Sequence, residues 1–281
     1  MNAKETDQGA ARIWRVSQKK NFITQCTRDG KPLQNRITGK TFFQFDKTFN
    51  EKASTYDVYE GVAQNIVESV VNGLNGTIFA YGQTSSGKTY TMQGSGTIEE
   101  GHGSTGGGVV HMAARDIFSQ IENHPERSFL FRVSFIEIYN EEVKDLLANG
   151  NDKVLKIRED SKRGVFVDAK EVYVTDVESL LGVLFAGEKH RAFASTGMND
   201  HSSRSHTIFR LTVESKQRKE ASDDNGSDDD NSVESLSDED EQDEAVRIST
   251  LNLVDLAGSE SVRHTGATGD RLKEGAAINQ R

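Results

Sequence analysis

The sequence predicts an α/β domain, and three patterns along its 281 residues support this fold class. Apolar residues recur at helical spacing between residues 59 and 74, and glycines at 73 and 76 end that run. Residues 76–81 form an apolar stretch that leads into a glycine-rich turn and then into a second helical pattern. From residue 129 to residue 135, phenylalanine and valine occupy every second position, which is typical of a strand with one buried face.

Each expected element has its own signal in chain order. The first helix carries its apolar positions at Tyr59, Val62, Ile66, Val70 and Leu74. The expected strand at 129–135 is defined by Phe129, Phe131, Val133 and Phe135. A second long helix is expected from Val177, Leu180, Leu181, Leu184 and Phe185. Two further strands are expected at 207–214 and 246–255, on either side of an acidic segment.

The glycine-rich turn has the sequence of a phosphate-binding loop, or P-loop. It reads Gly82, Gln83, Thr84, Ser85, Ser86, Gly87, Lys88, Thr89, and it stands between an expected strand and an expected helix. Glycines let backbone N–H groups surround a polyphosphate, and a helix N-terminus adds partial positive charge. Lys88 can reach the β- and γ-phosphates, and the Thr89 hydroxyl can ligate Mg²⁺. The alternative is a glycine-rich turn with a surface lysine.

Two later loops carry groups that suit the same ligand. Residues 199–206 (Asn-Asp-His-Ser-Ser-Arg-Ser-His) are rich in hydroxyls, which suit Mg²⁺ and phosphate oxygens, and Arg204 can pair with one carboxylate through two N–H groups. An apolar strand ends in Asp255, where an acidic residue would hold Mg²⁺ through water. Gly258 can bring its N–H close to a γ-phosphate, and Glu260 is the natural partner of Arg204. A serine-rich linker and an Asp-capped turn are the alternatives for the two loops.

Together these motifs resemble the kinesin motor domain. The resemblance rests on Phe79–Met92, on Glu137–Glu142 with Asp145–Leu147, on Ser202–His206 and on Asp255–Glu260, and it covers about residues 41–281. It implies a P-loop NTPase fold with a central mixed β-sheet flanked by helices on both faces. Residues 157–160 and 271–275 are similar to those of centromere-associated kinesins. The resemblance also implies an ATP-hydrolysing motor that moves along microtubules, with a spindle or kinetochore location among the possibilities within the cytoplasm and cytoskeleton.

The resemblance assigns roles to individual residues. Gly82–Thr89 would hold the ATP phosphates, with Tyr90 near the adenine. Residues 199–206 would form switch I, with Ser203 near the metal and the attacking water, and residues 255–260 would form switch II. Thr89, Ser203 and Asp255 would hold Mg²⁺. Arg204 and Glu260 would pair when the site closes, Gly258 would sense the γ-phosphate, and Asn279 would stand beside the water network.

The chain departs from the family pattern at both ends. Residues 1–40 are a divergent segment without the family's opening Arg-x-Arg-Pro strand, and Arg281 lies inside the expected microtubule-facing helix. We therefore expect a partial motor domain at 41–281 that lacks the first and last central strands. Those strands would lie beside the P-loop strand, so their loss would expose an apolar strand edge. The neck and the stalk through which kinesins form homodimers would also lie outside this chain.

Composition limits the other classes of function. The single cysteine, Cys26, forbids a disulfide framework within the chain, and no apolar run has the length of a membrane span or a signal peptide. We expect a soluble intracellular protein whose partners are microtubules, not nucleic acid or membrane. Lys156, Arg158, Lys162 and Arg163 form a basic cluster that is either a microtubule contact or a solvated face.

The net charge of −10 arises from one segment. Residues 220–244 contain 13 acidic residues and no lysine or arginine, and without them 34 basic residues stand against 31 acidic ones, a net charge of +3. We expect this segment to be a disordered insertion within the motor domain. It is either a solvated insertion without function or a regulator, since acidic residues follow Ser227, Ser235 and Ser237 at the third position.

Three functions stay open at this point. The chain is an ATP-hydrolysing microtubule motor, or an inactive or non-motor product that binds nucleotide or tubulin without a productive cycle, or another P-loop enzyme such as a GTPase. The sequence contains no Asn-Lys-x-Asp motif for reading guanine, which weakens the third.

Overall fold

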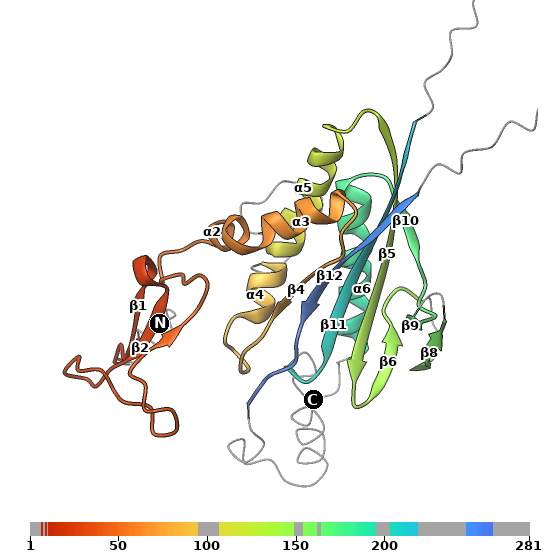
Figure 1. Ribbon diagram of the computed structural model, residues 1–281. Helices are drawn as coiled ribbons and strands as arrows, with labels where there is room; N and C mark the ends of the chain where they lie inside the picture. Colours follow the sequence, from red (N-terminus) through yellow and green to blue (C-terminus); the bar gives the residue numbers. More distant parts are fainter. Residues whose placement is uncertain are drawn as a thin grey trace, which may run out of the picture.

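The structure is a computed structural model that describes residues 11–94, 107–148, 154–161, 164–194, 203–218 and 246–260, together with Asp7 and Gly9. Figure 1 shows how the described elements are arranged. Several predictions concern residues outside this part: Asn279, residues 199–202, the acidic segment 220–244, and Lys162 with Arg163.

A seven-stranded mixed sheet forms the centre of the molecule. Its strands lie in the order β4-β12-β11-β5-β6-β7, and β10 pairs with β5 outside this path. β12 and β4 run parallel, whereas β12, β11, β5, β6 and β7 pair with antiparallel neighbours. The predicted mixed sheet is confirmed. Its strands are β4 (Gly76–Ala80), β5 (Arg127–Tyr139), β6 (Glu142–Asp145), β7 (Val154–Leu155), β10 (Val172–Val174), β11 (His206–Gln217) and β12 (Arg247–Asp255).

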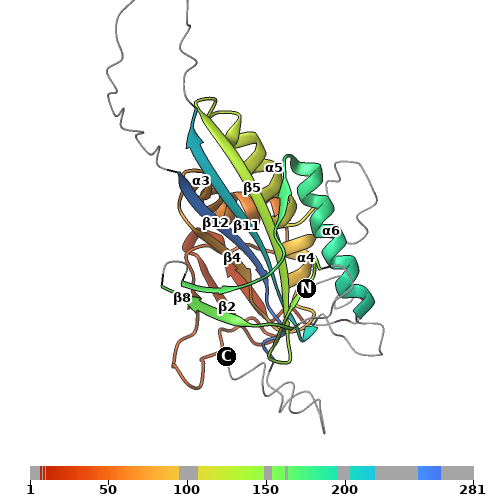
Figure 2. The same ribbon diagram turned by 90° about the vertical axis from the view of Figure 1, so that its right-hand side faces the viewer.

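Helices α3 to α6 share one hydrophobic core with this sheet (Figures 1 and 2). They are α3 (Gln64–Val71), α4 (Lys88–Gln93), α5 (Val109–Ile121) and α6 (Val177–Ala194). The alternation predicted for residues 129–135 is confirmed at Phe131, Val133 and Phe135, which are at most 3% exposed and point into this core. Helices on both faces of the sheet were expected. In the part of the chain that the structure describes, α3 to α6 pack on this one face.

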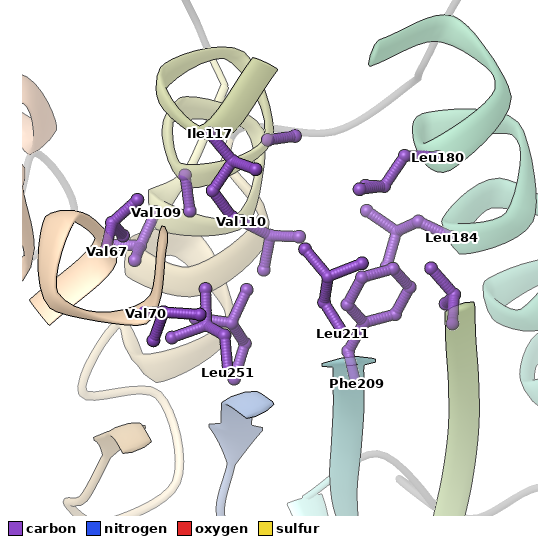
Figure 3. Close-up of a cluster of buried hydrophobic side chains, with 14 of the residues drawn as sticks. Val67, Val70, Val109, Val110, Ile117, Leu180, Leu184, Phe209, Leu211 and Leu251 are labelled. Carbon is purple, nitrogen blue, oxygen red and sulfur yellow. The ribbon is translucent and has the colours of Figure 1, made fainter. Parts of the chain in front are cut away.

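The core joins elements that are far apart in the sequence. Figure 3 shows side chains of three helices meeting those of β11 and β12: Val67 and Val70 of α3, Val109, Val110 and Ile117 of α5, Leu180 and Leu184 of α6, Phe209 and Leu211 of β11, and Leu251 of β12. Full burial of one such side chain contributes about 1.5–3 kcal/mol to stability. This packing fixes the sheet end where β4 and β12 stop side by side.

The first predicted helix is interrupted, which changes the face that it buries. It consists of α2 (Thr55–Val58), a π-helical turn η2 (Tyr59–Ala63) and α3. The side chain and backbone of Ser54 and Asp57 form a capping box that starts α2. Because the π turn inserts an extra residue, the buried positions are Tyr59, Ala63, Val67, Val70 and Val71. Val62 and Leu74 share the predicted helical spacing but are 46% and 64% exposed, and Leu74 lies beyond the end of α3 at Val71.

Two small sheets complete the described part. β1 (Trp14–Ser17), β2 (Phe22–Gln25) and β3 (Phe43–Gln44) form an antiparallel sheet, with a 3₁₀ turn η1 (Gln18–Lys20) between the first two. Cys26 follows β2 and is a buried free thiol. β8 (Ile157–Asp160) and β9 (Gly164–Val167) form a hairpin. A search of the described helices found none with the length and apolarity needed to cross a membrane.

Candidate nucleotide-binding site

The predicted P-loop connects the end of β4 to the start of α4. Ser85 and Gly87 have φ angles of 63° and 97°, so the loop makes its turn through two left-handed residues. A glycine adopts this conformation without strain, which explains the glycine at 87. Left-handed residues within a turn bring backbone N–H groups toward one side and form a concavity for anions. The two positive φ angles of the P-loop thus agree with the turn conformation of an anion-binding concavity.

Lys88 is held at this loop by its own backbone. Its Nζ donates to the carbonyl oxygens of Gly82 at 2.9 Å and Gln83 at 3.0 Å. The ammonium therefore stands over the loop, where phosphate oxygens would meet it.

Thr89 and Asp255 form the part of the site that suits a metal ion. Asp255 is the last residue of β12 and pairs in register with Ala80 of the parallel strand β4. Its carboxylate is buried, and Oδ2 accepts a hydrogen bond of 2.6 Å from the Thr89 hydroxyl. Oδ1 is buried and has no hydrogen-bond partner among the described residues. A buried carboxylate oxygen needs a partner, and a cation such as Mg²⁺ or its water would supply one, so these residues fit the predicted metal.

Backbone hydrogen bonds join the three predicted loops to one another. The N–H of Ser259 donates to the carbonyl oxygen of Gly82 at 3.1 Å, which connects switch II to the P-loop. The N–H of Gly258 donates to the carbonyl oxygen of Ser203 at 2.8 Å, which connects switch II to switch I. The structure therefore brings the P-loop together with two loops that lie more than a hundred residues further along the sequence.

Glu260 adds a side-chain connection between switch II and the P-loop. Its Oε2 accepts a hydrogen bond of 2.8 Å from the N–H of Thr84, and its Oε1 accepts from the Thr84 hydroxyl. Burial raises the pKa of the Glu260 carboxyl, but the bonds from Thr84 and the charge of Lys88 lower it by more, so that the net pKa lies below the ordinary glutamate value. The carboxylate is therefore charged at neutral pH.

The remaining predicted residues differ in their placement. Gln83, Ser85 and Ser86 are exposed on the P-loop, and Tyr90 on α4 is 57% exposed. Arg204 is half-buried beside Ser203. Its pairing with Glu260 and the roles of the other residues stay predictions, and Asn279 lies outside the described residues.

His206 belongs to the switch I motif but received no role from the sequence, and the structure shows a position for it. Its Nδ1 accepts a hydrogen bond of 3.2 Å from the N–H of Ala257. The imidazole thus connects the start of β11 to the loop that follows β12. The sequence of the motif does not indicate this contact, because its partner Ala257 follows another strand, β12.

A buried polar network beneath switch I was missed by the sequence reasoning. Arg191 of α6 is 4% exposed, and its guanidinium donates to Glu137 of β5 at 3.3 Å and to the Ser205 hydroxyl at 3.1 Å. Glu188 lies 3.7 Å from the same guanidinium and accepts a hydrogen bond of 2.7 Å from Gln93, the last residue of α4. A signal did exist: Arg191 continues the buried line of Leu180, Leu184 and Gly187, where a charge requires a partner.

Within this network, the pKa of the Glu188 carboxyl lies above the ordinary glutamate value. Burial raises the pKa of its carboxyl, and nearby Asp255 and Glu137 add to that rise, while Arg191 and Gln93 oppose it. The network therefore places the carboxylates of Glu137 and Glu188 beside one buried guanidinium. The charge of Asp255 also acts on Glu188.

Comparison with known proteins identifies the family. The family model described as the kinesin motor domain matches residues 1–281. The chain is 47% identical over 239 residues to "Kinesin-like protein KIN-7I" of Oryza sativa subsp. japonica, a match that covers 85% of this chain and 18% of that protein. It is also 47% identical over 247 residues to "Centromere-associated protein E" of Homo sapiens, covering 87% of this chain and 8% of that protein. The chain thus spans less than a fifth of these two relatives.

A solved structure agrees in fold. "Structure of a fast kinesin: Implications for ATPase mechanism and interactions with microtubules" matches with a TM-score of 0.77 at 33% sequence identity. The match covers 99% of this chain and 68% of that one. With the three loops meeting as they do in space, these matches show that the chain belongs to the kinesin motor domain family.

Proposed function

We propose that this chain binds ATP with Mg²⁺ where its three loops meet, and hydrolyses it as part of a microtubule-based motor. The observation that carries the proposal is the contact of all three loops at one end of the sheet, around a buried Asp255 oxygen without a described partner. Membership of the kinesin family supports ATP as the nucleotide.

The residues of the three loops have separate proposed roles, which together suit phosphoryl transfer. Lys88 and the P-loop N–H groups bind the phosphates, and Thr89, Asp255 and Ser203 would hold Mg²⁺, which when bound neutralises phosphate charge. Gly258 and Arg204 lie in loops that can respond to the γ-phosphate, and Asn279 and Ser203 are proposed to stand near the attacking water. No strong nucleophile from the protein is needed, because positioning and charge stabilisation dominate this reaction.

Microtubules are the proposed partner. The solved relative is described with its interactions with microtubules, and a cytoskeletal location follows for this chain, with a spindle or kinetochore as the finer proposal from the human relative's name. The β8–β9 hairpin carries exposed Arg158, which pairs with Asp168 at 3.2 Å, and it is a candidate contact. The division at residue 40 and a homodimer through a stalk beyond this chain remain part of the proposal.

Nucleotide binding by the P-loop can be tested directly. Titrate a fluorescent ATP analogue, with and without Mg²⁺, into the wild-type chain, Lys88→Ala and Thr89→Asn. We expect both variants to lose binding, because they remove the loop's charge and its metal ligand. Lys52→Ala, which removes an exposed lysine elsewhere, is the matched control and should bind normally. Undiminished magnesium-dependent binding in both P-loop variants would refute the assignment.

A further inference from the structure

Both carboxylate oxygens of Glu260 are directed at one residue of the P-loop. Thr84 offers two donors, its backbone N–H at 2.8 Å from Oε2 and its hydroxyl to Oε1, and the two bonds together form a bidentate contact. Hydrogen bonds to a charged acceptor are stronger than neutral ones. The contact joins residues 176 positions apart, so it closes switch II onto the P-loop.

The surroundings of this contact favour it. A Cβ atom at Gly258 would collide with the Glu260 carboxylate and would lie 2.5 Å from the Thr84 hydroxyl oxygen, so only glycine at 258 leaves room for the pair. The neighbouring Ser259 N–H is bound to the carbonyl oxygen of Gly82, which places the Glu260 backbone beside the loop. The charge of Lys88 also lowers the pKa of the Glu260 carboxyl and favours its anionic form.

We propose that the Glu260 carboxylate competes with nucleotide phosphate for the P-loop, and that Thr84 is the positioning residue that holds it there. The inference rests on the proposed function, because it assumes that phosphate binds this loop. A carboxylate and a phosphate both accept from backbone N–H groups, and the Thr84 N–H cannot donate fully to both. A phosphate that takes this N–H weakens the contact that holds Glu260 at the P-loop. Thr84 thereby links occupancy of the P-loop to the position of switch II.

The proposal and the simplest alternative predict opposite effects on nucleotide affinity when the Thr84 hydroxyl is removed. If the Thr84 hydroxyl holds Glu260, then removing the hydroxyl favours nucleotide. If the hydroxyl is instead a phosphate ligand, then removing it disfavours nucleotide. Thr84→Val keeps the shape and the N–H but removes the hydroxyl, whereas Thr84→Ser keeps the hydroxyl.

The contact itself is tested on the 281-residue chain without nucleotide. Measure denaturant unfolding of the wild-type chain, Thr84→Val, Glu260→Gln and the double variant. A hydrogen bond to a charged group predicts that each single change lowers the folding equilibrium constant by about tenfold. The double variant should lose little more than Glu260→Gln alone, because the hydroxyl bond that Thr84→Val removes depends on the Glu260 carboxylate. The contact would be contradicted if the decreases in the folding equilibrium constant multiply in the double variant. It would also be contradicted if neither single variant shows a decrease.

The competition is tested by rapid mixing with a fluorescent ATP analogue and Mg²⁺. Thr84→Val should bind about tenfold more tightly than the wild-type chain, and Thr84→Ser should match the wild-type chain. Weaker binding by Thr84→Val would overturn the proposal and make the hydroxyl a phosphate ligand. If the wild-type chain binds no analogue, the proposed function fails, while the unfolding experiment still decides whether Thr84 holds Glu260.

Discussion

Arg204 and Glu260 stand in two loops that touch each other, since the Gly258 N–H donates to the carbonyl oxygen of Ser203. A guanidinium and a carboxylate in such neighbouring loops can pair bidentately when the site closes. We predict that Arg204→Ala and Glu260→Ala each depress ATP turnover by about tenfold or more, since a partly buried charged contact contributes roughly that much. ATP binding should be retained in Arg204→Ala and should not weaken in Glu260→Ala, which removes the proposed competitor of phosphate.

Steady-state ATPase rates and analogue binding, measured in parallel, test this prediction. Arg28→Ala removes an exposed arginine from the loop after β2 and serves as the control. Near-normal turnover in both site variants would show that the pair does not contribute to the reaction.

Single residues were predictable where one stretch of sequence contains the whole chemical signal. Lys88 and Thr89 follow directly from the P-loop motif, and Asp255 follows from a strand that ends in an acid. The contact of Glu260 with Thr84 was not predictable, because it depends on where β12 lies relative to β4. The same holds for Ser205, whose partner Arg191 is on α6.

At the level of elements, α6 offers a matched pair of glycines. A Cβ atom at buried Gly187 would collide with the ring of Phe135 on β5, whereas at exposed Gly182 it would meet nothing within 4 Å. We predict that Gly187→Ala destabilises the fold by about 1–3 kcal/mol through overpacking. Gly182→Ala should stabilise it by about 0.5–1 kcal/mol, because alanine favours the helix.

Denaturant unfolding monitored by circular dichroism compares the two variants with the wild-type chain. Equal effects of the two substitutions would contradict the close packing of α6 on β5. The same packing carries Arg191 beneath switch I, so Gly187→Ala should also weaken nucleotide binding.

Element types were predictable from periodicity, whereas their exact faces were not. The alternation at 129–135 predicted a strand that extends over Arg127–Tyr139, and the apolar spacing at 177–185 predicted a helix that extends over Val177–Ala194. The predicted periodicity of the first helix does not give its buried face at Val62, because the π turn at 59–63 shifts the buried positions. It does not hold at Leu74, because α3 ends at Val71.

At the scale of the whole molecule, the acidic segment dominates the charge. Deleting residues 220–244 would change the net charge from −10 to +3. Because the microtubule surface is acidic, we predict tighter microtubule binding after deletion. The effect should be largest at low salt, since exposed charges are screened beyond about 8 Å at physiological ionic strength.

Microtubule co-sedimentation across a salt series measures this effect by comparing the chain with the deletion variant. The difference in microtubule affinity between the chain with residues 220–244 and the chain without them should become smaller as salt rises. The ATPase activity without microtubules should change little. Equal affinity at every salt concentration would mean that the segment projects away from the filament.

The edge strand β4 of the main sheet is the basis of a second prediction for the whole molecule. β4 is the first strand in the sheet order, and among the described residues it pairs on one side only. Phe79 and Tyr81 beside this edge are 62% and 73% exposed. Such edges pair with other chains, so we predict concentration-dependent association that Phe79→Lys reduces. Light scattering should show no reduction for Ser119→Lys, a control on the exposed surface of α5.

The most direct test of a shared nucleotide site is hydrogen exchange of the chain with and without magnesium and ATP. We predict slower exchange in all three loops at once, at residues 82–89, 203–206 and 255–260, and no slowing in Lys88→Ala. Binding that protects only the P-loop, or protection unchanged by Lys88→Ala, would contradict a site built from all three loops.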